Sequence, residues 1–187
     1  RLRGEVARRH PELAHDLTAL RLITLREALA SVGDDPALAE PAFDVFFAER
    51  QRVQWYADVR PALERLAARF PLLALSNGNA ELAATGLSAY FTGAVSARGC
   101  GVAKPAPHIF AVACAQLQCT VGQVMHVGDD WRLDVVGARQ AGLHTAWIRR
   151  PEAALHHGPA SPADDVAPPG RHLHLDDLLA LADALGA

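Results

Sequence analysis

The chain has 187 residues, of which 50% are hydrophobic and 21% are charged, as is ordinary for a globular protein. Its formal net charge of −3 argues against general nucleic-acid binding, which needs a basic surface. No stretch approaches the ~20 apolar residues of a membrane span, and three cysteines without CxxC spacing suit a reducing compartment, so we expect a cytoplasmic protein that binds neither nucleic acid nor membrane.

The first part of the chain predicts helices. Leucines, together with Ile23, recur at helical spacing from Leu13 to Leu29. Gly33 followed by Asp34-Asp35-Pro36 predicts the end of one helix and the start of another. The second helix is expected over residues 37–53. We expect packing to be the main role of both helices, with shaping of a substrate site as the alternative.

From Trp55 onward, short apolar runs alternate with helical patterns. Helices are expected from Pro61, over Pro107–Leu117, over Val135–Ala141 and from Asp176. Strands are expected at Leu72–Leu75, which we expect to be buried on both sides, and at Ala94–Ser96, Thr145–Ile148 and His172–Leu175. This alternation predicts the α/β class, with a Rossmann-like parallel sheet covered by helices on both faces. Residues 151–170, which are rich in proline and histidine, are expected to form a surface loop.

The stretch VMHVGDDWRLD, residues 124–134, is the strongest indication of chemistry. Its apolar run predicts a buried parallel strand that ends at Gly128, and ligands bind just past the carboxyl ends of such strands. Three carboxylates follow there: Asp129, Asp130 and Asp134. Because carboxylate oxygens suit a hard cation, we expect a Mg²⁺ site. The alternative is that an aspartate caps the next helix, which applies above all to Asp130.

Two further segments are expected at the same end of the sheet. Ser76 and Asn77 end a strand just before a predicted helix through Leu82, where a hydroxyl and backbone N–H groups can hold a phosphate oxygen. Lys104 follows a glycine turn and could present its amine to an anion, although a lone lysine is more often a solvated surface residue. Together with Mg²⁺, these groups describe a phosphate pocket.

Aromatic residues near the aspartates have simpler expected roles. His126 alternates within the predicted strand, so we expect a core histidine with satisfied hydrogen bonds. Trp131 either lines the pocket or packs. Four other histidines lie in or beside the predicted surface loop, and their spacing fits tetrahedral zinc poorly: His156, His157, His172 and His174.

The segments LALSNG, VAKPAPHIF and HVGDDWRLDVVGARQAGLHTAWI resemble, in this order, motifs two, three and four of the haloacid dehalogenase-like (HAD) hydrolase superfamily. The likeness covers roughly residues 55–150. It implies that Ser76 and Asn77 bind the transferring phosphoryl group and that Lys104 neutralises it. It also implies that Asp129 ligates Mg²⁺, with support from Asp134 and Asp130. Residues 1–56 then resemble part of the helical cap of that family, and residues 57–187 its HAD-like α/β core.

Within the superfamily, SNGNAELAATGLSAYF and the GDD–WIRR segment most resemble bacterial flavin mononucleotide phosphatases of riboflavin synthesis. This implies a Mg²⁺-dependent phosphatase, monomeric or homodimeric, that hydrolyses a small phosphorylated metabolite such as flavin mononucleotide through an aspartyl-phosphate. One alternative is a 2-haloacid dehalogenase-type hydrolase, which uses the same fold without a metal. The other is a catalytically inactive member that binds a ligand or partner through its cap.

The first motif of the superfamily, DxDx[TV], is absent from its expected place. It supplies the nucleophilic and acid/base aspartates, and Asp34-Asp35 has no apolar strand before it. We therefore expect the nucleophile to lie upstream of Arg1. We also expect the motif-one strand to be missing from these 187 residues. That strand would lie between the strands ending at Ser76 and Asp129, so two strand edges are expected to be unpaired.

Overall fold

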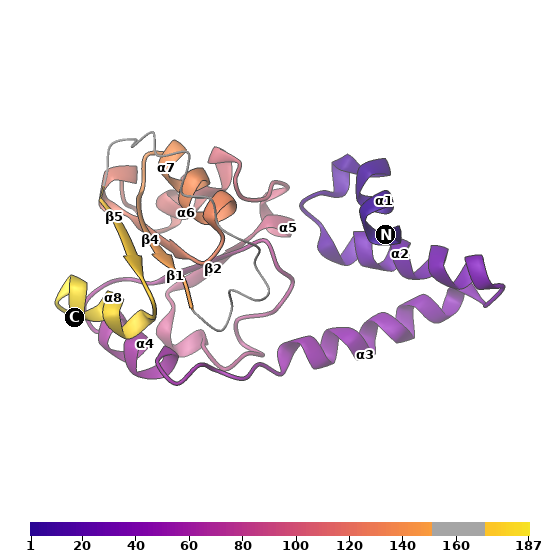
Figure 1. Ribbon diagram of the computed structural model, residues 1–187, viewed down its shortest axis with the longest axis horizontal. Coiled ribbons are helices and arrows are strands. Elements are labelled where there is room, and N and C mark those ends of the chain that lie inside the picture. Colours follow the sequence, from indigo (N-terminus) through magenta and orange to yellow (C-terminus); the bar gives the residue numbers. More distant parts are fainter. Residues whose placement is uncertain (151–170) are drawn as a thin grey trace.

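The computed structural model describes residues 1–150 and 171–187, so the predicted loop at 151–170, with His156 and His157, lies outside the described residues. Two lobes are visible in Figure 1: a helical lobe formed by α1 to α3, and an α/β lobe formed by the elements from α4 to α8. Within the described residues, no helix has both the length and the apolar character needed to cross a membrane.

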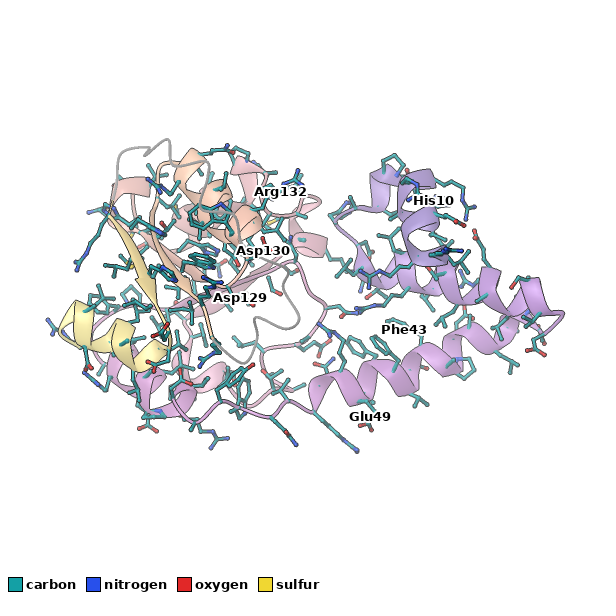
Figure 2. All side chains as sticks on the ribbon, viewed as in Figure 1. His10, Phe43, Glu49, Asp129, Asp130 and Arg132 are labelled. Atoms are coloured by element: carbon teal, nitrogen blue, oxygen red, sulfur yellow. The ribbon has the colours of Figure 1, made fainter. Side chains whose placement is uncertain are left out.

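The helical lobe is built around its longest helix, α2. Its elements are α1 (Leu2–Arg9), η1 (Pro11–Leu13), α2 (Leu17–Val32), η2 (Pro36–Leu38) and α3 (Ala39–Gln51). Asp16 caps α2 by accepting hydrogen bonds from the backbone N–H groups of Thr18 and Ala19, and Gly33 ends it with a φ of 83°. Phe43 is buried and lies on the side of α3 that faces α2, whereas Glu49 lies on the outer side (Figure 2). The predicted pair of helices is confirmed.

Within residues 1–150 and 171–187, the α/β lobe contains five parallel strands in two sheets, which confirms the predicted fold class. In one sheet, β1 (Leu73–Ser76) pairs with β2 (Gly93–Ser96). In the other, β4 (His144–Ile148) lies between β3 (Met125–Gly128) and β5 (His172–Leu175). In the part of the chain that the structure describes, β1 and β3 are each paired along one edge, as expected for the two neighbours of a missing middle strand.

Helices cover both faces of these sheets. They are α4 (Val59–Ala67), α5 (Ala97–Cys100), α6 (Pro107–Gln116), α7 (Gly137–Gln140) and α8 (Leu178–Leu185), with short 3₁₀ turns η3 (Ser88–Tyr90) and η4 (Val121–Gln123). Ile109 and Phe110 of α6 are fully buried in one core cluster, with Leu143 before β4. Leu66 of α4 and Leu181 of α8 form a second cluster. The hydrophobic core therefore has a layer on each side of the strands.

Four local predictions were wrong. No helix runs through Leu82, because the chain after β1 forms turns there. The helix expected from Val135 begins earlier, as a π-helix η5 (Trp131–Val136) that continues into α7. The apolar residues of β1 are half-buried rather than buried on both sides, because β1 has a strand neighbour along one edge. Helix α8 is capped by Asp177 rather than Asp176.

Candidate active site

Lys104 joins the two sheets at the carboxyl ends of β1 and β3. Its amine donates to Asp134 Oδ1 at 2.6 Å and to the backbone oxygen of Leu75 at 3.3 Å. The Lys104 and Asp134 side chains are 12% and 6% exposed, so this ion pair is largely shielded from solvent. Lys104 is also the only lysine in the 187 residues. The Lys104 side chain is thus largely shielded, and it is not the solvated surface residue of the alternative.

Asn77 holds the backbone of Lys104. Its amide nitrogen donates to the Lys104 carbonyl oxygen at 3.0 Å, and its amide oxygen accepts from the Lys104 N–H at 2.8 Å. The reciprocal pair fixes the segment just before the cis Lys104–Pro105 peptide bond. Both ends of the Asn77 side chain are thus used to position Lys104, a role that the sequence pattern did not predict.

Asp134 is the centre of the site. Its Oδ1 accepts from Lys104 and from His126 Nε2 at 2.9 Å, and its Oδ2 accepts from the backbone N–H of Asp130 at 3.1 Å. Burial alone would raise the pKa of Asp134, but hydrogen bonding to His126 and the charge of Lys104 outweigh burial and hold the pKa well below its usual range. Asp134 is therefore a carboxylate that anchors two other side chains.

Gly128 allows this close approach. A β-carbon at residue 128 would overlap the Asp134 carboxyl group, so the turn after β3 needs glycine at that position. His126 lies two residues earlier in β3, and the two-residue period of a strand puts residues 126 and 128 on the same face. This spacing was the signal that could have assigned His126 to the Asp134 network. As expected, the histidine has a satisfied hydrogen bond, and it also packs edge-on against Phe110.

Asp130 and Asp129 differ in their surroundings. Asp130 caps η5, because its Oδ1 accepts from the Leu133 N–H at 2.8 Å, which is the structural alternative weighed from the sequence. Asp129 directly follows β3 and is exposed. Its backbone oxygen accepts from the indole N–H of Trp147 at 2.9 Å. Figure 2 shows Asp129 and Asp130 together in the α/β lobe, and Trp131 packs against Trp147 with ring centroids 4.9 Å apart.

The three aspartates do not form a ready metal site by themselves. Within residues 1–150 and 171–187, no group of three His, Cys, Asp or Glu side chains is arranged to hold a metal ion. Asp134 is engaged by Lys104 and His126, and Asp130 is engaged as a helix cap. Asp129 is exposed at the carboxyl end of β3, a position that a cation can reach.

Ser76 lies at the exposed end of β1. Its hydroxyl oxygen accepts from the Gly78 N–H at 2.9 Å, which closes a tight turn. The expected helix N-terminus is absent here, so any anion at Ser76 would meet the hydroxyl and turn N–H groups rather than the end of a helix. Ser76, Asn77, Lys104 and Asp129 all lie at the same edge of the two sheets, as predicted.

A family profile described as haloacid dehalogenase-like hydrolase matches residues 4–142. The chain is 34% identical over 153 residues to the 5-amino-6-(5-phospho-D-ribitylamino)uracil phosphatase YigB of Escherichia coli (strain K12), covering 80% of this chain and 64% of the relative. It is 32% identical over 131 residues to a phosphoserine phosphatase of Thermus thermophilus, covering 67% of this chain and 53% of the relative. The chain thus spans less than two thirds of the length of these curated relatives.

A solved structure is similar along the whole chain. The crystal structure of a 2-haloacid dehalogenase from Pseudomonas syringae pv. Tomato DC3000 matches with a TM-score of 0.80 and 33% identity, and the match covers 100% of this chain and 79% of that chain. An L-2-haloacid dehalogenase from Xanthobacter autotrophicus shares the fold at a TM-score of 0.71 and 21% identity, covering 100% of this chain and 84% of that chain.

Proposed function

Because the chain belongs to the haloacid dehalogenase-like hydrolases, we propose that it hydrolyses a small phosphorylated metabolite in a Mg²⁺-dependent reaction. The observation that carries the proposal is the Lys104 amine, held by Leu75 and Asp134 at the carboxyl ends of β1 and β3. A fixed positive charge in a partly buried site stabilises an anion more strongly than the same charge in water.

The bonding of Lys104 leaves it able to bind a phosphate oxygen. An ammonium group has three N–H donors, of which Leu75 and Asp134 accept two. The third is assigned to the substrate. Asn77 contributes by fixing the Lys104 backbone, and the Ser76 hydroxyl at the end of β1 is assigned to a second phosphate oxygen.

Magnesium enters the proposal through Asp129. Asp129 directly follows β3 and is exposed, so its carboxylate lies where a hard cation can reach it. We therefore assign Asp129 to the ion and assign Asp134 to the positioning of Lys104. The acid cluster predicted from the sequence is thus divided between two roles in the proposal. The helical lobe, residues 1–56 in the predicted division, is assigned as a cap over the site.

The substrate proposal rests on the named relatives. The Escherichia coli relative is named as a phosphatase of 5-amino-6-(5-phospho-D-ribitylamino)uracil. Separately, the segment SNGNAELAATGLSAYF resembles flavin mononucleotide phosphatases. A phosphate of riboflavin synthesis is accordingly the first substrate to test. Phosphoserine, named for the Thermus relative, is the second.

The test is phosphate release by the protein expressed from its complete reading frame, because no nucleophile is assigned within residues 1–187. Flavin mononucleotide, 5-amino-6-(5-phospho-D-ribitylamino)uracil and phosphoserine are compared with and without EDTA. We expect Mg²⁺-dependent release that falls at least about 100-fold in Lys104→Met and in Asp129→Asn, which each remove one charge from the site. Unchanged turnover in Asp129→Asn would refute the metal assignment.

The structural match to a 2-haloacid dehalogenase supports a second candidate function, because it extends along the whole chain at 33% identity. The same preparations are therefore assayed for halide release from 2-chloropropionate. Halide release that is insensitive to EDTA, with no phosphate release, would replace the phosphatase proposal with dehalogenation.

A further inference from the structure

Two arginines of the helical lobe meet at one residue of the α/β lobe. Arg21 of α2 donates to Asn79 Oδ1 at 3.0 Å, and Arg50 of α3 donates from its Nε to the same oxygen at 3.1 Å. Asn79 lies three residues after Ser76, in the turn that follows β1. One neutral amide oxygen thus accepts hydrogen bonds from two cations that come from different helices.

The positive charge at this point is not balanced by the described residues. Across residues 1–150 and 171–187, neither Arg21 nor Arg50 forms an ion pair with a carboxylate. Burial, followed by the neighbouring charges of Arg50 and Arg3, lowers the pKa of Arg21. The Arg21 guanidinium lies 4.6 Å from the ring centroid of Phe46, which orients the cation without neutralising it.

Arg50 also lies beside the proposed phosphate site. A β-carbon placed on Gly78 would lie 3.1 Å from Ser76 Oγ and 3.7 Å from Arg50 Nη2. The hydroxyl and the guanidinium therefore border the same small space, which is open because residue 78 is glycine. The Nε–H group of Arg50 donates to Asn79. The Nη N–H groups of the same planar guanidinium can therefore donate to another acceptor. A phosphate group has oxygens that can accept from both neighbours at once.

We infer that Arg50 binds the phosphate group of the substrate together with Ser76, with Arg21 adding its charge, and that Asn79 is the positioning residue that holds both guanidinium groups there. The inference deepens the proposed function and rests on it for the identity of the anion. It makes phosphate a shared ligand of the two lobes, since Arg21 and Arg50 come from the helical lobe and Ser76 from the α/β lobe.

The direct test is to measure the binding of inorganic phosphate by isothermal titration calorimetry at low ionic strength. We expect Arg50→Gln to weaken the Kd about tenfold, which corresponds to one charge-assisted hydrogen bond. The matched control is Arg52→Gln, because Arg52 follows the same helix but is exposed and pairs with Glu49 at 2.9 Å. Unchanged affinity in Arg50→Gln, or an equal loss in Arg52→Gln, would overturn the inference.

A second variant separates anion binding from simple contact between the lobes. Asn79→Asp keeps the shape of the side chain but places a carboxylate between the two arginines. We expect a higher Tm, because the cations gain a partner, together with phosphate affinity at least about tenfold weaker, because that partner competes with the ligand. A higher Tm with unchanged phosphate affinity would show that Asn79 and the arginines serve only the contact between lobes.

The same titration identifies which anion the arginines recognise. Glycerol 3-phosphate and 3-phosphoglycerate differ by a carboxylate, and we expect Arg50→Gln to weaken both by the same factor. A loss confined to 3-phosphoglycerate would assign Arg50 to a second anionic group and overturn the inference. Binding needs no turnover, so Arg50-dependent phosphate binding without catalysis would count against the proposed function alone. Catalysis with unaltered phosphate affinity in Arg50→Gln would count against this inference alone.

Discussion

Asp134 is the residue on which the candidate site depends for its stability. It is 6% exposed and accepts hydrogen bonds from Lys104, His126 and the Asp130 N–H. We expect Asp134→Asn to lower the free energy of unfolding by about 3–5 kcal/mol, because it leaves the largely buried Lys104 charge without an opposite charge. Urea denaturation measures this change. The control is Asp183→Asn, whose carboxylate is 70% exposed and pairs with Arg65, so its cost should stay within about 1 kcal/mol.

Two helical glycines should respond in opposite directions to the same substitution. A β-carbon on Gly137 would lie 2.6 Å from Pro105 Cβ and 2.9 Å from its Cα, which are rigid neighbours. We expect Gly137→Ala to destabilise the protein by about 1–3 kcal/mol through overpacking. On Gly4 in α1 the nearest atom is a flexible Arg8 nitrogen at 3.6 Å, so Gly4→Ala should be neutral or stabilising by up to about 1 kcal/mol. Thermal unfolding measures the Tm of both variants. Equal changes in Tm would refute the contact between residue 137 and Pro105.

The sequence was most informative about single residues where chemistry and position agreed. The glycine, aspartates and lysine of the three motifs pointed to one sheet edge, and Lys104 and Asp134 do meet there. The sequence was less informative about which aspartate has which role, because a carboxylate can cap a helix, ligate a metal or pair with a cation. Arg21, Arg50 and Asn79 gave no local signal at all, since their association depends on how two helices meet a distant turn.

Among the elements, one carboxylate ties together α4, β4 and α8. Asp58 precedes α4 and accepts two hydrogen bonds from Arg150, at 2.8 and 2.7 Å, and one from the Leu178 N–H at 2.9 Å. Burial alone would raise the pKa of Asp58, but the hydrogen bonds from Arg150 and Leu178 outweigh it and set the pKa below its usual value. The Asp58–Arg150 ion pair is therefore a second largely buried ion pair, which joins elements of the fold outside the candidate site.

This link gives a pH dependence of known sign. A carboxylate whose pKa is depressed by folding contributes stability above its unfolded pKa of about 3.9, and the contribution is lost as the pH falls through the folded value. We expect Asp58→Asn to cost about 3 kcal/mol at pH 7 and progressively less below about pH 4. Urea denaturation of both proteins from pH 7 to pH 2 measures the difference. A difference that stays constant over this range would contradict the assignment.

Element types were predicted well where a helical pattern extended over many residues or where a short run of strand-forming residues stood between turn residues. The strands β2, β4 and β5 and the helix α6 lie within a residue or two of their expected bounds. The turn after β1 was misassigned because the apolar Leu82 suggested a helix, whereas the hydrogen bonds of Asn79 to α2 and α3 hold that segment in another conformation. Tertiary contacts thus overrode the local pattern.

At the scale of the whole molecule, the division of the strands into two sheets predicts unequal stability. β4 is paired on both sides and its residues from Thr145 to Ile148 are buried, whereas β1 is paired with β2 along one edge and is half-buried. We expect backbone amides of β4 to exchange with deuterium at least about tenfold more slowly than those of β1, because opening β1 exposes less apolar surface. Hydrogen exchange measured by mass spectrometry tests this. Equal protection of the β1 and β4 amides would show that β1 is paired along its second edge as well.

The solitary lysine gives the molecule a built-in spectroscopic reporter. Protein grown with ¹⁵N-lysine as its labelled amino acid would carry, within these 187 residues, one labelled backbone amide, and that amide donates to Asn77 at 2.8 Å. In a heteronuclear spectrum, these 187 residues would contribute a single backbone cross-peak, from a residue of the candidate site. Its chemical shift would follow ligand occupancy without any assignment of the remaining resonances.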